Sequence, residues 1–337
     1  MKRAGASLFA TKPKSIDLES DVVRFEPVGT DILPLLVRPV SEDVSLVKWS
    51  GTQLGMLRRK LHEHGGILFR GFGLDSAEEF HEAVSALGGE QLDYTERSSP
   101  RSRVQGRIFT STDHPADQSI NFHNELAYAG SWPQEIFFFC RTPAADGGET
   151  PLADSRRVLS NLTVETRDRF RQHGVMYTRY LGSGLGLHWR EVFQTDDRSS
   201  VEKYCREQGI GFEWDGECLR TKVVRPAIRT HPMTGEEVWF NHGHFFNVHS
   251  MAPDVREQIL TTVERENIPF NTSFGNGDEI LPEVVAEIDH AFESARVEFP
   301  WQVGDLLWLD NMLTAHARNP YRGERTILVA MTDPVAG

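Results

Sequence analysis

The sequence predicts an α+β protein whose core is a double-stranded β-helix (jelly roll), with flanking helices and a helical insertion between the strand around residue 123 and a distal histidine at 316. Short apolar runs bounded by Gly, Pro, Asn or Asp recur along the chain, as in architectures that pair many short strands. Other segments carry apolar residues at helical spacing. Neither an internal repeat nor a linker divides the chain. We therefore expect one domain over residues 21–337, preceded by a flexible amino terminus at 1–20.

The first expected elements are a helix, a strand and a second helix. Apolar residues repeat at helical intervals over 51–64, and Gly65-Gly66 ends that helix. Residues 67–72 form an apolar run that is typical of a buried strand. Asp75 or Ser76 caps the second helix, and Gly88-Gly89 ends it. The expected inner-face residues of the two helices are Leu54, Leu57 and Leu61, then Phe80, Val84 and Leu87.

The remaining elements alternate between strands and amphipathic helices. Strands are expected at 121–125, 135–140, 306–309 and 326–329. Helices are expected at 154–170, 199–208, 253–266 and 281–295. The glycine-rich run at 179–189 lacks the preceding strand and the Gly-Lys-Ser/Thr of a phosphate loop, so we interpret it as a flap over the pocket.

The composition is that of an acidic globular protein. A net charge of −13 would repel phosphate backbones and anionic lipids, so we expect neither nucleic acid nor a membrane as a partner. No apolar run approaches the ~18 residues that a membrane span requires. Cys140, Cys205 and Cys218 are odd in number and lack metal-type spacing, which indicates free thiols and a cytoplasmic location. The oligomeric state stays open.

One pair of residues offers metal ligands. Among the 13 histidines, His123 is the only one that begins a His-x-Asp/Glu pair, with Glu125. If residues 121–125 form a strand, both side chains project from one face. His316 from a distant strand would complete two histidines and one carboxylate, the facial set of non-haem Fe(II) oxygenases. The alternative is a solvated surface pair that binds no metal.

Two other residues could bind a carboxylate beside this set. Arg325 follows a turn and lies where the chain re-enters the sheet as the strand at 326–329. Its planar guanidinium can donate two parallel hydrogen bonds to one carboxylate. Thr150, just after the Gly147-Gly148 turn, supplies a hydroxyl group.

Together these residues resemble a known family. The chain resembles the taurine dioxygenase and clavaminate synthase-like family of Fe(II)/2-oxoglutarate oxygenases over about residues 65–334. The resemblance lies in the segments around His123-x-Glu125, 147–150, 231–241 and His316 with Arg325. They look most similar to the branch of syringomycin-type amino-acid hydroxylases in nonribosomal peptide pathways. Four ordered motifs at family-like spacing are more specific than any one of them.

The resemblance implies a cofactor set and a reaction. Fe(II) would be held by His123, Glu125 and His316. The open positions on the metal would be taken by 2-oxoglutarate and O2. Arg325 would anchor the far carboxylate of 2-oxoglutarate, and Thr150 would donate a hydrogen bond to that carboxylate. Halogenating members of the family lack the carboxylate ligand, so Glu125 favours hydroxylation. Desaturation, epoxidation and cyclisation use the same iron site and stay open. The implied substrate is an amino acid or a derivative of one, free or tethered to a peptidyl carrier protein, in natural product biosynthesis.

The residues that would contact substrate are less clearly indicated. The candidates are Asn121, Arg97, Asn241, His242, His244 and Arg318. If they share a strand face, His242 and His244 could also form a rival metal site with His249 or a carboxylate. His231 precedes a Pro and a Thr-Gly turn, so we expect it to hold a hairpin rather than a metal.

Two other function classes remain open at this stage. A zinc-dependent hydrolase could use the same three ligands with a bound water, but it would not need Arg325 or Thr150 and would work without oxygen. A non-catalytic β-barrel binding protein would need no metal at all.

Overall fold

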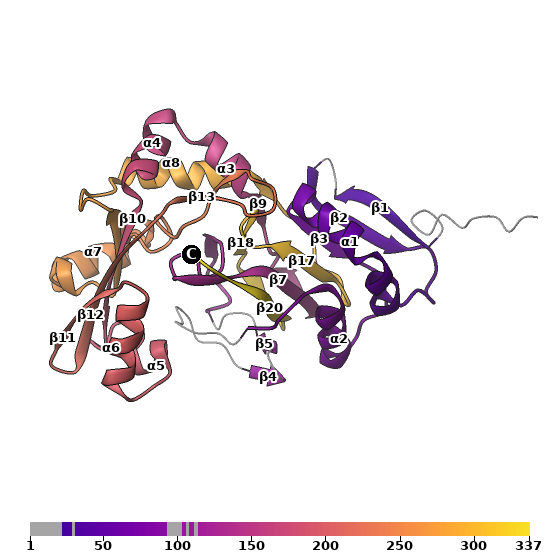
Figure 1. Cartoon of the computed structure of the whole chain (residues 1–337), viewed down its shortest axis with the longest axis horizontal. Helices are drawn as coiled ribbons and strands as arrows, with labels where there is room; N and C mark the ends of the chain where they lie inside the picture. The colour runs from indigo at the N-terminus through magenta and orange to yellow at the C-terminus, as the bar shows by residue number, and fades with distance from the viewer. Residues whose placement is uncertain (1–21, 29–30, 93–102, 106–107, 111–113) are drawn as a thin grey trace, which may run out of the picture.

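A computed structural model describes residues 22–28, 31–92, 103–105, 108–110 and 114–337. Two β-sheets enclose an apolar core, helices cover them, and a third sheet with short helices forms a separate lobe on the left of the view (Figure 1). The predicted flexible terminus at 1–20 lies outside the described residues. That the rest is one domain stays a prediction.

The larger sheet has eight strands. Their order is β1 (Val23–Val28), β2 (Asp31–Pro39), β3 (Gly66–Phe69), β17 (Leu306–Asp310), β7 (Ser131–Thr142), β20 (Thr326–Ala336), β5 (Ile108–Thr110) and β4 (Arg103–Gln105). Neighbours are antiparallel except β2 and β3. The predicted strands at 67–72, 135–140, 306–309 and 326–329 all belong to this sheet, although the first ends at Phe69.

Both faces of the larger sheet are covered, which explains why its central strands are continuously apolar. On β17, Leu306 and Trp308 pack with helices α1 (Leu46–His64) and α2 (Ala77–Leu87), whereas Leu307 and Leu309 face the core of the barrel. Phe137 and Phe138 of β7 divide between the same two clusters. One strand therefore contributes to two hydrophobic cores.

The two helices begin and end at residues suited to capping. Ser45 accepts a hydrogen bond from the Lys48 amide at the start of α1, and Gly65 ends that helix in the left-handed region at φ 76°. Ser76 caps α2 by accepting from the Glu79 amide. The predicted inner-face residues Phe80, Val84 and Leu87 are buried, and so are Leu57 and Leu61.

The smaller sheet carries the candidate metal ligands. Its order is β16 (Arg296–Val297), β9 (Leu152–Asp154), β18 (Thr314–Arg318) and β6 (Ile120–His123), all antiparallel. A short pair, β8 (Asp146–Gly147) and β19 (Tyr321–Arg322), extends beside it. Helices α3 (Ser155–Asn161) and α8 (Pro282–Glu293) contribute Val158, Leu159, Ile288 and Phe292 to the core between the two sheets.

The insertion is not only helical. It contains the antiparallel sheet β11 (Gly211–Asp215), β12 (Cys218–Arg225), β10 (Val175–Leu181) and β15 (Phe270–Phe274), and the hairpin β13 (Ile228–Thr230) with β14 (Glu237–Trp239). The insertion also contains the helices α4 (Val164–His173), α5 (Trp189–Phe193), α6 (Arg198–Glu207) and α7 (Pro253–Thr262). It further contains the 3-10 turns Val248–Ser250 and Arg265–Asn267. The glycine-rich run overlaps the end of β10 and leads into α5, so the expectation that no strand precedes it is wrong. Its role as a flap stays a prediction.

Three predicted elements need correction. The helix at 154–170 is two helices, because Thr163 caps α4 and breaks the chain direction after Leu162. The helix at 253–266 ends at Thr262 and continues as a 3-10 turn. The strand at 121–125 ends at His123.

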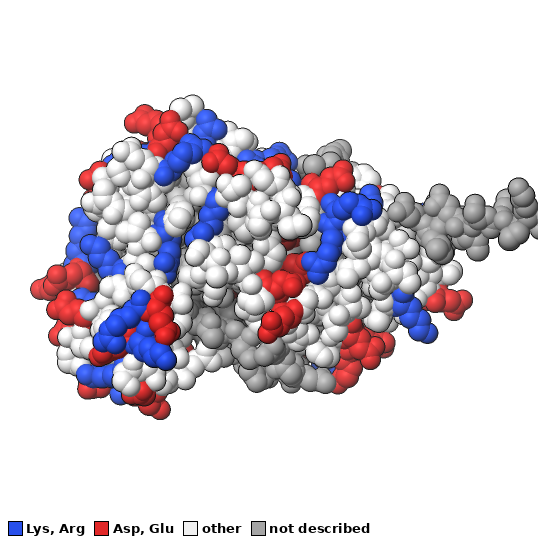
Figure 2. Space-filling model, viewed as in Figure 1, with Lys and Arg blue, Asp and Glu red and all other residues white. Residues whose placement is uncertain are grey.

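The surface in this orientation mixes charges of both signs rather than showing one large patch (Figure 2). Among the described residues, the structure contains no helix with the length and apolarity needed to cross a membrane.

Candidate metal centre

Two histidines are brought together by strand pairing. His123 ends β6 and His316 lies in β18, and the antiparallel register places the two residues directly opposite each other. Their ring centroids are 4.3 Å apart. The imidazoles therefore meet because the β-ladder aligns two segments that are far apart in the sequence.

The carboxylate joins them from a turn. Glu125 lies two residues beyond His123, after the strand has ended, and is buried. One potential ligand atom from each of His123, Glu125 and His316 lies within 4.8 Å of the other two. The prediction that His123 and Glu125 share a strand face is wrong, because a turn, and not strand alternation, presents the acid.

The hydrogen bond on the His123 ring orients its other nitrogen. Nδ1 lies 2.9 Å from the Asn121 carbonyl oxygen, so the neutral ring donates from Nδ1 and carries its lone pair on Nε2. Such an outer hydrogen bond fixes the tautomer of a metal-binding histidine.

A narrow cavity adjoins the two histidines. It is lined by His123 and His316, by the apolar Ile120, Phe138, Ile327 and Val329, and by Thr150, Ala317, Arg318 and Arg325. The ring of Phe138 lies 5.0 Å from that of His316. The cavity is therefore mostly apolar with a cationic end, which suits a small anion.

Arg325 is held in this cavity without an acidic partner among the described residues. Its Nε donates to the Gly148 carbonyl at 2.8 Å and its Nη2 to the Thr150 hydroxyl at 3.4 Å. Burial, followed by repulsion from Arg318, lowers the pKa of Arg325 to about 10. The guanidinium still carries its charge at neutral pH, so the cavity contains a desolvated cation in need of an anion.

Thr150 is oriented by two donors. Its hydroxyl oxygen accepts from Trp301 Nε1 at 3.1 Å and from Arg325 Nη2. An oxygen that accepts twice directs its own hydrogen elsewhere, so this hydroxyl is available as a donor beside the guanidinium. Trp301 is a contributor to this site that the sequence analysis missed.

The structure brings some of the predicted substrate residues together, but not all of them. Arg97 lies outside the described residues. Asn241 is fully buried, and its side chain bonds only main chain, donating to the Ala227 carbonyl and accepting from the Gly243 amide. Asn121, His244 and Arg318 line one cavity beside α8, which shares Ile120, Ala317 and Arg318 with the narrow cavity at the two histidines. His242 lies beside His123, with their ring centroids 5.9 Å apart.

Arg318 lines the narrow cavity and also donates hydrogen bonds to main-chain carbonyl groups. Its guanidinium donates to the carbonyl oxygens of His114, Pro115 and Gln118 at 2.6–3.0 Å. These bonds tether the segment that leads into β6. The substrate-contacting role predicted for Arg318 therefore competes with hydrogen bonds that its guanidinium already makes.

The rival histidine site is not formed. Residues 243–246 are a turn, so His242 and His244 do not share a strand face. Within the part of the chain that the structure describes, these two and His249 make no group of three donors at ligand distance. Burial lowers the pKa of His244 to about 3 and that of His242 well below its usual value, so both rings are neutral.

The expectation for His231 is confirmed. Its Nδ1 accepts from the amides of Met233 and Thr234 in the turn between β13 and β14. Its Nε2 lies 3.0 Å from a carboxylate oxygen of Asp310. The ring thus ties the hairpin to the end of β17.

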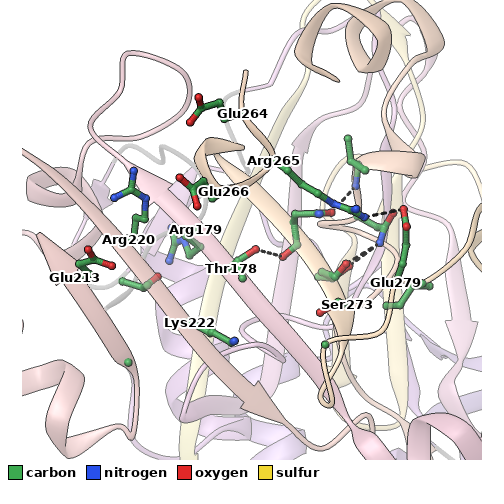
Figure 3. Close-up of a pocket in the computed structure, with 18 of the residues that line it drawn as sticks. Thr178, Arg179, Glu213, Arg220, Lys222, Glu264, Arg265, Glu266, Ser273 and Glu279 are labelled. Carbon is green, nitrogen blue, oxygen red and sulfur yellow. Dashed lines mark hydrogen bonds and ion pairs between the residues drawn. The ribbon is translucent and has the colours of Figure 1, made fainter. Parts of the chain in front are cut away.

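A much larger cavity, of about 950 Å³, lies on the insertion sheet (Figure 3). Its wall contains Arg179, Arg220 and Lys222 but also Glu213 and several other acids, so it favours neither sign of charge. None of the three candidate ligands lines it. The cluster of candidate ligands and this larger cavity are therefore separate places.

Comparison with known proteins agrees with this geometry. Residues 31–332 match the family described as taurine catabolism dioxygenase TauD, TfdA family. The dapdiamide synthesis protein DdaC of Enterobacter agglomerans is 41% identical over 276 residues, covering 82% of this chain and 84% of that protein. A clavaminate synthase-like protein of Arabidopsis thaliana is 33% identical over 291 residues, covering 83% and 85%.

Solved structures share the fold at low sequence identity. PvcB, described as an Fe, alpha-ketoglutarate dependent oxygenase from an isonitrile synthetic pathway, has a TM-score of 0.55 at 16% identity and covers 98% of this chain and 94% of its own. A taurine dioxygenase from Burkholderia xenovorans has a TM-score of 0.55 at 16% identity, covering 94% and 91%. These likenesses confirm the jelly-roll fold class. By the extent of the family match and the identity of its relatives, the chain belongs to the TauD/TfdA dioxygenase family, the Fe(II)/2-oxoglutarate-dependent enzymes that its motifs resembled.

Proposed function

We propose that His123, Glu125 and His316 bind Fe(II) in this enzyme. The supporting observation is the convergence of their ligand atoms within 4.8 Å, from a strand, a turn and a second strand. Two imidazoles and one carboxylate on one side of a metal leave the opposite positions open, the donor set used by Fe(II) oxygenases. The hydrogen bond from His123 Nδ1 to Asn121 supports metal binding through Nε2.

Arg325 and Thr150 are proposed to bind the far carboxylate of 2-oxoglutarate. The buried, charged guanidinium lacks a described acidic partner, and the Thr150 hydrogen is directed away from the two groups that donate to its oxygen. The apolar wall of Phe138, Ile327 and Val329 excludes water, which strengthens these charged contacts. A zinc hydrolase would have no use for this cationic cavity.

When bound together, Fe(II), 2-oxoglutarate and dioxygen supply the oxidising chemistry: one oxygen atom enters succinate, formed with loss of CO2, and the other enters a C–H bond of the substrate. The chain contributes binding and orientation. Because Glu125 fills the carboxylate position, hydroxylation is the proposed outcome, with desaturation, epoxidation or cyclisation as alternatives that the same donor set allows.

The proposed substrate is an amino acid or an amino-acid derivative, free or carried on a peptidyl carrier protein. Support comes from the sequence motifs and from the 41% identity to a protein of dapdiamide synthesis. We place the enzyme in the cytoplasm, since none of the three cysteines is in a disulfide.

The proposal is tested with anaerobic protein. Adding Fe(II) and then 2-oxoglutarate should produce a visible metal-to-ligand absorption band, and amino acids or carrier-bound aminoacyl groups that bind near the metal should shift it. Admitting oxygen to a complex that shifts should yield succinate and a product with one added oxygen atom by mass spectrometry. Absence of the band, or turnover that continues without oxygen, would favour the hydrolase or the binding protein.

A further inference from the structure

The side chain of Asn311 bridges the turn that presents Glu125. Its Oδ1 accepts from the Glu125 amide at 2.7 Å, and its Nδ2 donates back to the Glu125 carbonyl at 2.9 Å. The same Nδ2 donates to the Pro133 carbonyl at 2.8 Å. The side-chain amide therefore pairs with both main-chain groups of one residue, as a neighbouring β-strand would do.

The main chain of Asn311 is equally engaged. Its amide donates to the Gln134 carbonyl at 2.8 Å in β7, and its carbonyl accepts from Asn124 Nδ2 at 2.7 Å. The residue is fully buried. It lies five positions before His316, in the turn from β17 to β18, so it joins the segment carrying one candidate ligand to the turn carrying another.

The three candidate ligands are not fixed by the same means. His123 and His316 are aligned by the ladder between β6 and β18. Glu125 lies beyond the end of β6, and the next residue, Leu126, has a φ of 56°, a left-handed conformation that is uncommon for a non-glycine residue. Among the described strands, none pairs with the main chain of Glu125, which is hydrogen-bonded by the side-chain amide of Asn311 instead.

We infer that Asn311 is a positioning residue that sets the Glu125 carboxylate relative to His316 in the metal centre. The inference rests on the proposed metal-binding role of these residues. It predicts that truncating Asn311 loosens the turn and weakens metal binding, because the carboxylate then has to be ordered when the metal binds.

The variant Asn311→Ala leaves the Glu125 amide, the Glu125 carbonyl and the Pro133 carbonyl without their partner. A second variant, Asn311→Asp, keeps the shape and the acceptor for the Glu125 amide but loses both donations. It guards against the case in which the alanine variant fails to fold.

The matched control is Asn247→Ala. Asn247 is also buried, and its side chain also makes three hydrogen bonds, to the Thr272 carbonyl, the Thr272 hydroxyl and the His249 amide. It lies in the insertion and lines the larger cavity there, not the narrow cavity at His123 and His316. Its loss should lower thermal stability without changing the affinity for metal.

The experiment titrates each apo-protein with Co(II), a spectroscopic substitute for Fe(II), and measures thermal unfolding without metal. The dissociation constant for Co(II) should rise about 10- to 100-fold in both Asn311 variants, with a changed visible spectrum, and stay within about twofold of wild type in Asn247→Ala. If the Asn311 variants bind Co(II) as tightly as Asn247→Ala does, the inference is wrong while the proposed function stands. If wild type and His316→Ala bind Co(II) equally, the proposed metal site itself fails.

Discussion

Replacing Arg325 tests the proposed co-substrate pocket most directly. Of the five N–H groups on the guanidinium, Nε–H is used by the Gly148 carbonyl and one Nη2–H by the Thr150 hydroxyl. Arg325 lines the narrow cavity, and no Asp or Glu of the described chain lines it with Arg325. The pKa of about 10 keeps the group charged at assay pH.

The magnitude follows from the bonds that would be lost. A carboxylate bound by the fork gains two charge-assisted hydrogen bonds, each contributing about 1.5–3 kcal/mol. The variant Arg325→Gln removes both and should weaken 2-oxoglutarate binding by about 3–6 kcal/mol, which is about 10²- to 10⁴-fold. The variant Arg325→Lys keeps a charge but not the fork, so its loss should be smaller, about 10- to 100-fold.

The assay is an anaerobic titration of the Fe(II)-loaded protein with 2-oxoglutarate, followed by the rate of succinate formation against 2-oxoglutarate concentration. Arg322→Gln is the control, because this exposed arginine belongs to the same turn and does not line the cavity. Fe(II) affinity should be unchanged in every variant. A dissociation constant for 2-oxoglutarate within threefold of wild type in Arg325→Gln would refute the reasoning about this pocket.

Three other predictions concern Thr150, the candidate ligands and a buried acid of the larger sheet. Thr150→Val should raise the KM for 2-oxoglutarate about tenfold and lower thermal stability, because it removes a donor and leaves Trp301 Nε1 without its acceptor; equal KM values would exclude the hydroxyl from binding. Glu125→Ala and His316→Ala should abolish succinate formation and lose iron measured by elemental analysis, and normal turnover in either would remove that residue from the ligand set. Burial raises the pKa of Glu135 from 4.5 to about 7, so the folded state holds this proton more tightly than the unfolded chain does. The protonated carboxyl group therefore contributes to the free energy of unfolding below pH 4.5, and this contribution falls by about 3 kcal/mol as the pH rises to 7. Urea unfolding across this range should show that slope in wild type and not in Glu135→Gln, and parallel curves would contradict it.

The sequence predicted those elements whose formation depends on local pattern. The central strands were visible because a strand covered on both faces is apolar at every position, as Leu306 to Leu309 are. The helix starting at Ala77 was visible because a serine cap and an apolar stripe both lie within a few residues of each other. His123 and Glu125 were visible from the local His-x-Glu pattern, whereas the order of the motifs was needed to link His316, which lies far away in the sequence, to this pair.

Other features depended on tertiary context. The hairpin of β11 and β12 has a local sequence signal, since Asp215-Gly216 lies between two alternating segments. The helical spacing of other segments in the insertion outweighs this signal, so the sequence predicts helices there. The turn at 243–246 looked like a strand because His242 and His244 alternate with small and apolar residues. The contacts of Asn311 with Glu125 and Pro133 were not accessible to sequence reasoning, because each joins residues well over one hundred positions apart.

The way Glu125 is held has a consequence for the chemistry that this fold supports. Asn311 binds only the main-chain amide and carbonyl of Glu125, and these are present whatever side chain occupies the position. The two histidines are aligned independently, by strand pairing. Because these main-chain contacts do not involve the Glu125 side chain, exchanging this candidate ligand should have little effect on the turn or the ladder. On this reasoning the unfolding temperature of Glu125→Ala should lie within a few degrees of that of apo wild type, although this variant removes a candidate ligand. The unfolding temperature of Asn311→Ala should fall further below that of apo wild type, although this variant removes no candidate ligand.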